Sequence, residues 1–119
     1  MKLPHLAPLI FAKEVLEKSD EHSKVLCEFE QVPKLFTFIE AAAQSSSSFI
    51  DPVKPMLGFL ATVKNIAQHH EFNDLSYVVS LKLEAHIGEY RQFYFEAVSK
   101  SDPKSIIISG NFTVIIKEA

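Results

Sequence analysis

The sequence has little cysteine and no concentration of positive charge. Cys27 is the only cysteine among 119 residues, so an intramolecular disulfide and a cysteine-rich zinc cluster are both excluded. The 12 lysines and arginines are outnumbered by 15 aspartates and glutamates, which gives a formal net charge of −3. Nucleic-acid binding needs a basic surface, and no run of basic residues indicates a membrane-surface patch. We therefore expect neither nucleic acid nor membrane among the partners.

Long apolar segments are missing too. No stretch approaches the roughly 20 apolar residues that a helix needs to cross a bilayer. The first eleven residues, MKLPHLAPLIF, contain two prolines where a signal peptide needs an unbroken apolar run. These absences favour a cytoplasmic location. A hydrophobic content of 47% over this length indicates a single globular domain, residues 1–119, with a core of its own.

Two periodicities divide the chain into elements. Apolar residues recur at helical spacing from Pro33 to Ile50, which predicts one long helix with a proline at its start. Elsewhere, alternating or β-favouring residues predict six strands, over 8–19, 23–30, 56–66, 76–86, 91–99 and 105–118. In 8–19, β-favouring residues are mixed with charges, so a helix is the alternative to the favoured strand. In the strand 23–30, Cys27 falls on the apolar side, so we expect a buried thiol and not a nucleophile.

The alternation also assigns side chains to the two faces of the sheet. In the strand 76–86 one face should carry Tyr77, Val79, Leu81, Leu83 and Ala85. The opposite face should carry Ser80, Lys82, Glu84 and His86. In the last strand the residues expected to share a face are Ile106, Ile108, Phe112, Val114 and Ile116. His22 and His86 are expected to face solvent at strand ends.

The order of elements, β-β-α-β-β-β-β, predicts the fold. A long antiparallel sheet must cover its apolar face, and only one helix is available to do so. The economical arrangement is a curved sheet wrapped around that helix, which is the α+β hot-dog architecture. Small residues at 41–43 and 45–48 should let strands or a partner helix approach the helix closely. No Gly-x-Ser-x-Gly turn surrounds the serines at 45–48, so packing is favoured over a nucleophilic role.

Several segments resemble the β-hydroxyacyl-acyl carrier protein dehydratases. FIEAAAQ at 38–44 is similar to the helix signature of that family and is the most specific match. The other similar segments are LPH at 3–5, EVL at 14–16, GFLATVKN at 58–65 and GNFTVIIK at 110–117. The short loop before the helix looks most like the divergent branch of predicted dehydratases associated with aryl-polyene-type pathways. The resemblance covers nearly the whole chain, in order.

The resemblance implies a role for Glu40. In the family the equivalent acid faces an acyl-thioester tunnel at a dimer interface and works with a histidine of the opposing subunit. Removing water from a 3-hydroxyacyl thioester requires a base and an acid, and Glu40 would supply that acid/base function. Gln44, one turn further on, would orient Glu40. Tunnel lining near Gly58 and Phe59, and a carbonyl-binding N–H from Lys34 or Leu35, complete the implied site.

This chain departs from the family at the histidine. The family places it in a glycine-rich loop, fourteen residues before the glutamate, where this sequence has Leu26. His5, from the LPH segment, is expected to be structural, with a substitute base as the alternative. His69 and His70, followed by Glu71, are expected to form a loop surface and not a metal site. For Glu40 itself the alternative is a first-turn glutamate favoured by the helix dipole; its apolar neighbours suggest incomplete solvation.

The sequence thus predicts an acyl-thioester-acting hot-dog protein resembling 3-hydroxyacyl-carrier-protein dehydratases. Whether it is catalytically active stays open: a dehydratase (a lyase) is the first alternative, a thioesterase the second, and an inactive acyl-binding partner subunit the third. We expect no cofactor besides the phosphopantetheine of an acyl carrier protein or coenzyme A. The expected assembly is a dimer joined at sheet edges, either a homodimer or a heterodimer with a related dehydratase. Lys34, Lys64 and Arg91 would attract an acidic carrier.

Overall fold

The computed structural model describes residues 11–49 and 56–118, and its elements follow the predicted order. They are β1 (Ala12–Lys18), β2 (His22–Glu28), α1 (Leu35–Ser45), the 3₁₀ helix η2 (Ser46–Phe49), β3 (Met56–Gln68), β4 (Ser76–Ile87), β5 (Tyr90–Ser99) and β6 (Asp102–Glu118). The α-helix ends at Ser45 and tightens into η2, where the sequence pattern predicted one continuous helix. No helix within the described ranges is long and apolar enough to span a bilayer.

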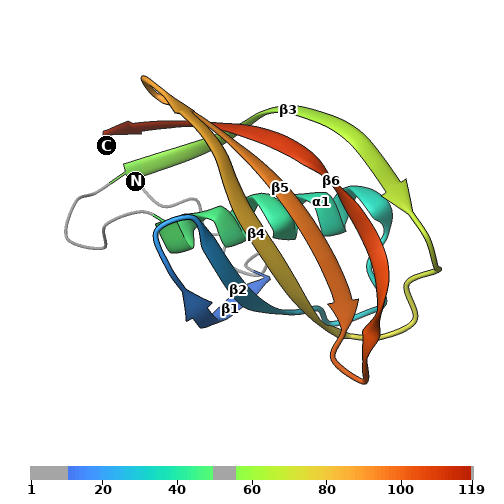
Figure 1. Cartoon of the computed structure of the whole chain (residues 1–119). Coiled ribbons are helices and arrows are strands. Elements are labelled where there is room, and N and C mark those ends of the chain that lie inside the picture. The colour runs from blue at the N-terminus through green and yellow to red at the C-terminus, as the bar shows by residue number, and fades with distance from the viewer. Residues whose placement is uncertain (1–10, 50–55, 119) are drawn as a thin grey trace.

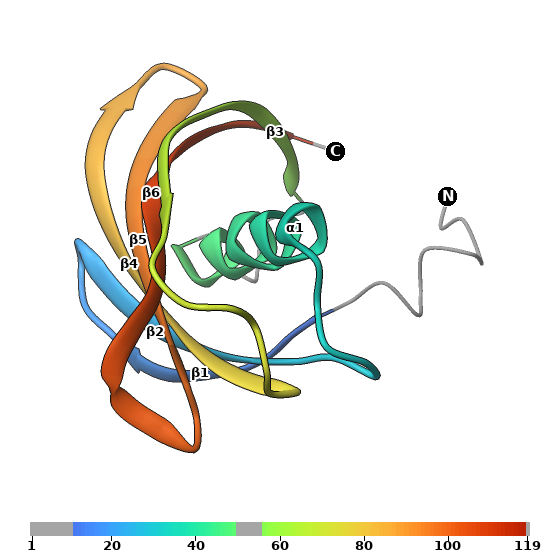
Figure 2. The ribbon, with the colours of Figure 1, turned by 90° about the vertical axis from the view of Figure 1, so that its right-hand side faces the viewer.

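The six strands form one antiparallel sheet in the order β1-β2-β4-β5-β6-β3. The sheet curves, and α1 lies across its concave side (Figure 1). Figure 2 shows the helix nearly end-on, with the sheet around one side of it and no described strand over the opposite side. The predicted hot-dog architecture is therefore confirmed. The two edges of the sheet, β1 and β3, each have only one strand neighbour.

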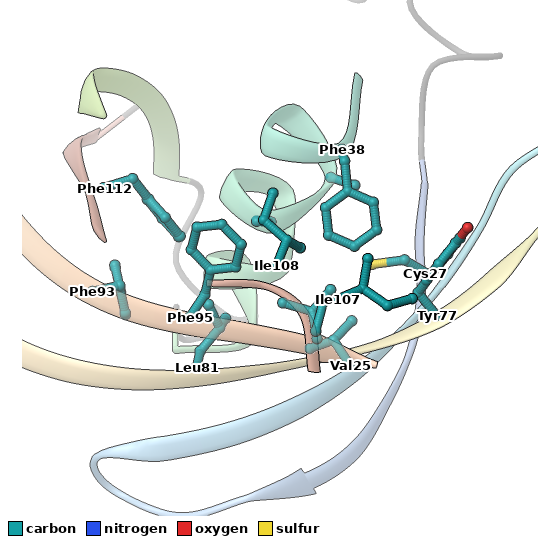
Figure 3. Close-up of a cluster of buried hydrophobic side chains, with 14 of the residues drawn as sticks. Val25, Cys27, Phe38, Tyr77, Leu81, Phe93, Phe95, Ile107, Ile108 and Phe112 are labelled. Atoms are coloured by element: carbon teal, nitrogen blue, oxygen red, sulfur yellow. The ribbon is translucent and has the colours of Figure 1, made fainter. Parts of the chain in front are cut away.

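Apolar side chains of α1 fill the concave side of the sheet. The helix buries Phe38, Ile39, Ala41, Ala42 and Ser45. The small side chains let the helix backbone approach the strands, whereas Phe38 reaches into the core toward the aromatic and aliphatic residues of β2, β4, β5 and β6 (Figure 3). Burial of each large apolar side chain contributes on the order of 1.5–3 kcal/mol, so this face of α1 is fixed against the sheet.

Aromatic rings form two stacks between helix and sheet. Phe38 lies at the centre of the first, with its ring centroid 4.8 Å from Phe72 and 5.8 Å from Phe29. Tyr77 meets Phe38 edge-on at 5.1 Å, and Phe11 stacks on Phe29 at 4.9 Å. The second stack contains Phe49, Phe93, Phe95 and Phe112. Together the stacks anchor both ends of the α1–η2 segment.

Small polar side chains join the end of the helix to β2. The Sγ atom of Cys27 lies 3.3 Å from Oγ of Ser45, which also donates to the Ala41 carbonyl at 2.8 Å. Oγ of Ser23 lies 2.8 Å from Oγ of Ser48. Cys27 is buried, and the serines serve helix packing, as the sequence predicted.

Two β-bulges move some side chains to the face of the sheet opposite the predicted one. The register of β4 against β5 shifts between Leu83 and Ala85, so Ala85 pairs with Gln92 and His86 pairs with Arg91. Arg91 pairs with the buried Val114 and therefore faces the helix side. The predicted positions of Ala85 and His86 are consequently wrong: the extra residue moves His86 to the helix side, although it stays exposed.

The second bulge lies in β6. Ala97 pairs with Ile108 but Val98 pairs with Ile106, so Ile107 is the extra residue. Ile107 is buried whereas Ile106 is 38% exposed, so the prediction that Ile106 faces the core is wrong. Strict alternation fails because a bulge places two consecutive residues opposite one.

Candidate functional site

Glu40 lies in the second turn of α1, on the side away from the sheet. The helix begins at Leu35 and its first turn contains no acidic residue, so the first-turn interpretation of Glu40 is wrong. The side chain is exposed, although Ile39 and Ala41 on either side are buried. The expectation that the carboxyl is incompletely solvated stays a prediction. Consecutive helical residues point about 100° apart, so buried neighbours do not imply a buried glutamate.

Glu40 belongs to an open stripe along the helix. Residues three or four apart share a helix face, and the stripe contains Phe36, Glu40, Ala43 and Gln44. Phe36 and Glu40 are exposed, while Ala43 and Gln44 are half-buried. Gln44 contacts the start of β1, and Ala43 packs against the core. The carboxyl group of Glu40 and the ring of Phe36 are therefore the groups of the stripe that are available to a second molecule.

The start of α1 lacks a capping side chain. Lys34 is the N-cap residue, with extended φ and ψ of −89° and 165°, and its side chain makes no capping hydrogen bond. Its carbonyl accepts the first helical bond from Phe38 N at 2.9 Å. The N–H groups of the first turn, including that of Leu35, therefore donate to no capping side chain. Because the first turn contains no acidic residue, the positive end of the helix dipole can attract an oxygen acceptor.

Gln44 ties the beginning of β1 to the helix. Its Oε1 atom accepts hydrogen bonds from Phe11 N at 2.8 Å and from Ala12 N at 3.3 Å. The sequence pattern could not reveal this contact, because it joins residues more than thirty positions apart. Gln44 follows Glu40 by one turn, as predicted, and the orienting role toward Glu40 stays a prediction.

The remaining predicted residues lie in different parts of the molecule. Gly58 and Phe59 are in β3, paired with Ile116 and Ile115, and their side-chain surroundings lie outside the described part. His5 lies outside the described residues altogether.

Two of the three basic residues expected near a carrier entrance lie at opposite ends of the α1–η2 segment. Lys34 is exposed at the start of α1, and Lys64 is exposed on β3. Arg91 Nη1 donates to the Phe49 carbonyl at 3.4 Å, at the far end of η2. The α1–η2 segment separates Lys34 from this contact by roughly 20 Å. Arg91 instead complements the negative end of the helix.

Among the described residues, no histidine hydrogen-bonds to Glu40, and a substitute base at His5 stays a prediction. His69 and His70 are exposed in the loop after β3, as predicted, and their N–H groups both face the Ile107 carbonyl. His22 and His86 are exposed on β2 and β4. Within the described ranges, no three histidine, cysteine or acidic side chains are grouped as a metal site would require.

An aspartate-serine cluster at the β3–β4 loop was not predicted from the sequence. Asp74 Oδ2 accepts hydrogen bonds from Ser99 Oγ and, at 2.8 Å, from Ser101 Oγ. Its Oδ1 accepts from Leu75 N at 2.7 Å. The bonds from the two serines and Leu75 hold the pKa of this carboxyl well below its usual range. The cluster fastens the start of β4 to the β5–β6 turn. Both carboxylate oxygens of Asp74 already accept hydrogen bonds from the chain itself.

A shallow pocket of about 190 Å³ lies at another place, at the β1–β2 hairpin. Its lining includes Lys18, His22, Lys24 and Ser80. Lys24 is paired with Glu17 at 3.3 Å, and both side chains are largely exposed. The pocket does not include Glu40, so it does not contribute to the candidate site.

A curved six-stranded antiparallel sheet around one central helix places this chain among proteins of the hot-dog fold. Solved structures that resemble it include a chain of the dehydratase heterocomplex ApeI:P from Xenorhabdus doucetiae, with a TM-score of 0.71 and 16% identity over 98% of this chain and 88% of that one. A hypothetical thioesterase with coenzyme A from Streptococcus pneumoniae TIGR4 has a TM-score of 0.63 and 10% identity over 88% of this chain and 85% of that one.

A hot-dog-like protein from Thermanaerovibrio acidaminovorans is similar as well, with a TM-score of 0.63 and 10% identity over 96% of this chain and 88% of that one. No protein-family model and no curated protein matches the sequence. At these identities the structural likeness establishes the fold.

Proposed function

We propose that this chain acts on acyl thioesters, in the manner of 3-hydroxyacyl-acyl carrier protein dehydratases, and that Glu40 is its acid/base group. The observation that carries the proposal is the position of Glu40 on the open stripe of the central helix, in a fold shared along 98% of the chain with a dehydratase-complex subunit. The helix signature FIEAAAQ, which resembles the dehydratases, contains this glutamate.

The chemistry requires a proton to leave C2 and a hydroxyl to leave C3 of the substrate. The Glu40 carboxylate would take the C2 proton, and the carboxylic acid so formed would give that proton to the C3 hydroxyl, which leaves as water while the C2–C3 double bond forms. The N–H groups at the uncapped start of α1, at Lys34 and Leu35, would donate to the thioester carbonyl oxygen and stabilise the developing negative charge. These proton transfers need no group besides the substrate and the protein.

A second hot-dog chain would complete the site. Strand β3 has a free edge, and pairing it with another chain would extend the sheet and bring a second helix toward the open stripe. Glu40 would then be enclosed, and the thioester, carried by the phosphopantetheine of an acyl carrier protein or coenzyme A, would lie between the chains. The partner is a second copy, or a related dehydratase that supplies the missing histidine.

Two other activities fit the same site. A thioesterase needs one carboxylate to activate water, so the missing histidine loop would matter less, and the neighbour from Streptococcus pneumoniae is a hypothetical thioesterase. A non-catalytic subunit would hold the acyl group for an active partner. Both require thioester binding, but neither yields the enoyl product of dehydration.

The test compares the wild-type protein with Glu40→Gln and with Glu14→Gln, an exposed glutamate on β1, as the matched control. Each is incubated with 3-hydroxyacyl- and acyl-pantetheine thioesters, and enoyl product and free thiol are followed separately. We expect enoyl product, reduced by about 100-fold or more in Glu40→Gln and unchanged in Glu14→Gln.

Free thiol instead of enoyl product would identify a thioesterase. Binding without turnover would identify the acyl-binding subunit. Turnover that survives Glu40→Gln would remove the catalytic role of Glu40, and a protein that binds no thioester would contradict the proposed function.

A further inference from the structure

The outer side of the sheet, opposite α1, carries a row of aliphatic side chains. The row has one residue from each of β2, β4, β5 and β6, and each pairs directly with the next: Leu26, Val78, Val98 and Ile106. Paired residues share a face of the sheet. Their sequence neighbours Cys27, Tyr77 and Ile107 are buried in the core, so the row lies on the outer side. Figure 2 shows α1 on the other side of the sheet, so the helix does not cover the row.

The aliphatic row is too small to hold a second molecule by itself. Ile106 is 38% exposed, and the other three side chains are half-buried by their neighbours on the sheet. Stable interfaces surround an apolar centre of this kind with complementary polar groups over a wider area. The residues on either side of the row therefore decide what this surface can bind.

Polar residues flank the row on both sides. Residues two positions apart on a strand share a face, so a flanking residue stands before and after each row position. The first flank crosses β2, β4 and β5 through the paired residues Lys24, Ser80 and Glu96. The second flank crosses the same strands through Glu28, Ser76 and Lys100. The N–H of Lys100 donates to the Ser76 carbonyl at 3.0 Å, which continues the β4–β5 register to this position. The two flanks are thus oppositely charged on β2 and on β5, and both carry serine on β4.

The charged groups of the flanks are accessible on this surface. Lys24 forms a salt bridge with Glu17 at 3.3 Å, but the two side chains are 52% and 69% exposed, so this pair contributes little and can be shared. Tyr94 Oη donates to Oε2 of Glu96 at 3.1 Å, which holds that carboxylate on the outer side. Lys100 is exposed.

We propose that the outer side of the sheet is an interface with a second copy of this chain, packed sheet to sheet about a twofold axis that runs along the aliphatic row. This rotation places each row residue over its own copy and exchanges the two flanks. Glu28 then faces Lys24 of the second copy, and Lys100 faces Glu96 of the second copy. By symmetry each contact occurs twice.

The charges select this axis over the other twofold arrangement of two packed sheets. An axis parallel to the strands, between β4 and β5, would place Glu96 over Ser80 and Lys100 over Ser76. Neither charge would then meet its opposite, and the aliphatic row would gain nothing in exchange. Packed sheets lie about 10 Å apart with strand directions within about 30°, a distance that lysine and glutamate side chains span together.

The proposed interface is separate from the candidate site and from the β3 edge. Glu40 lies on the helix, on the opposite side of the sheet (Figure 2). The inference therefore does not depend on the proposed function. Chains that also join through β3 would form pairs of dimers, with four chains in the assembly.

Exchanging the charges of one contact tests the interface. The proteins are wild type, Glu96→Lys, Lys100→Glu, an equal mixture of these two variants, and Lys13→Glu. Lys13 is the matched control because it is an exposed lysine of β1 that belongs to neither flank. Sedimentation equilibrium over a range of concentrations measures each association constant.

We expect wild type to associate beyond the edge-joined dimer, and each single variant to raise the dissociation constant of that step at least about tenfold. The reason is that positions 96 and 100 of facing copies then carry like charges. The mixture should recover the wild-type constant, since each variant supplies the charge that the other needs, and Lys13→Glu should keep it. Recovery also shows that both variants are folded.

Three results would overturn the inference. The first is a wild-type protein that forms no assembly besides the dimer joined at β3. The second is an association that neither single variant weakens, which would leave the row as a contact between strands of one chain. The third is a mixture that associates no better than its two components, because the facing charges would then not be those of positions 96 and 100.

Discussion

At the scale of single residues, the Cys27 thiol is enclosed between β2 and α1. Burial raises its pKa to about 11, against a smaller opposing effect of the hydrogen bond with Ser45. At pH 8 only about one thiol in a thousand is then ionised, and the thiolate is the reactive form. We expect a thiol reagent to leave the folded protein almost unlabelled and to react quickly in denaturant. Cys27→Ser provides the blank, and rapid labelling under native conditions would contradict the buried position.

Glu40 illustrates what the sequence could and could not predict about the site. The residue type and its helix were identified from FIEAAAQ, and the helix is present. The adjacent Ile39 and Ala41 are buried on other sides of the helix, so they do not indicate the exposure of Glu40. Phe36, four positions before, lies on the same helix face and is exposed. The contact of Gln44 with β1 had no sequence signal, since it depends on how distant elements pack.

At the scale of elements, the Asp74 cluster fixes the entry into β4. Its carboxylate accepts hydrogen bonds from two serines of the β5–β6 turn, so the charged form is favoured in the folded state and the pKa is lowered. A group with a lowered pKa stabilises the fold fully above its unfolded-state pKa, near 4 for aspartate. That stabilisation is lost as the pH falls below about 4 toward the folded-state value.

Asp74→Asn should therefore lower the free energy of unfolding at pH 7 by about 1 kcal/mol, a modest value because the group is partly solvated. The difference from wild type should shrink on acidification below about pH 4, where the wild-type carboxyl also becomes protonated in the unfolded chain. Urea unfolding at pH 7 and at lower pH measures both. Asp102→Asn, in the same turn region and exposed, is the control. A difference that is constant with pH would exclude the charge as the cause.

The strand elements were predictable because alternation and helical spacing are local properties of the sequence. The face of the sheet that each side chain occupies was predictable only up to the first bulge in its strand. In β4 the extra residue after Leu83 exchanges the sides of Ala85 and His86, and in β6 an extra residue turns Ile106 outward. A bulge depends on the register with the partner strand, so the sequence of one strand does not reveal it.

At the scale of the whole molecule, the two sheet edges differ. The short edge strand β1 carries Lys13, Glu14, Glu17 and Lys18 and has two register irregularities, which discourage further strand pairing. Edge strand β3 is longer, its described part contains the single charge of Lys64, and its exposed residues include Leu60 and Val63. The sequence predicted the elements and an edge-to-edge dimer. It did not predict the strand order, which places β3 at an edge of the sheet. The asymmetry favours β3 as the joining edge.

Val63→Lys tests this assembly. Val63 pairs with the buried Phe112 but is 38% exposed, so the flexible stem of a lysine there can carry its charge to solvent. The substitution would place a second positive charge beside Lys64 on the joining edge. Two chains paired through this edge would then bring like charges together, and the dimer dissociation constant should rise at least about tenfold. Ile106→Lys is the matched control, because Ile106 is also 38% exposed but lies on β6, whose two neighbours are already in place. Sedimentation equilibrium should find a weakened dimer in the first variant alone. Equal dimer dissociation constants in both variants would exclude β3 as the dimer edge and would require the open stripe of α1 to be covered from another direction.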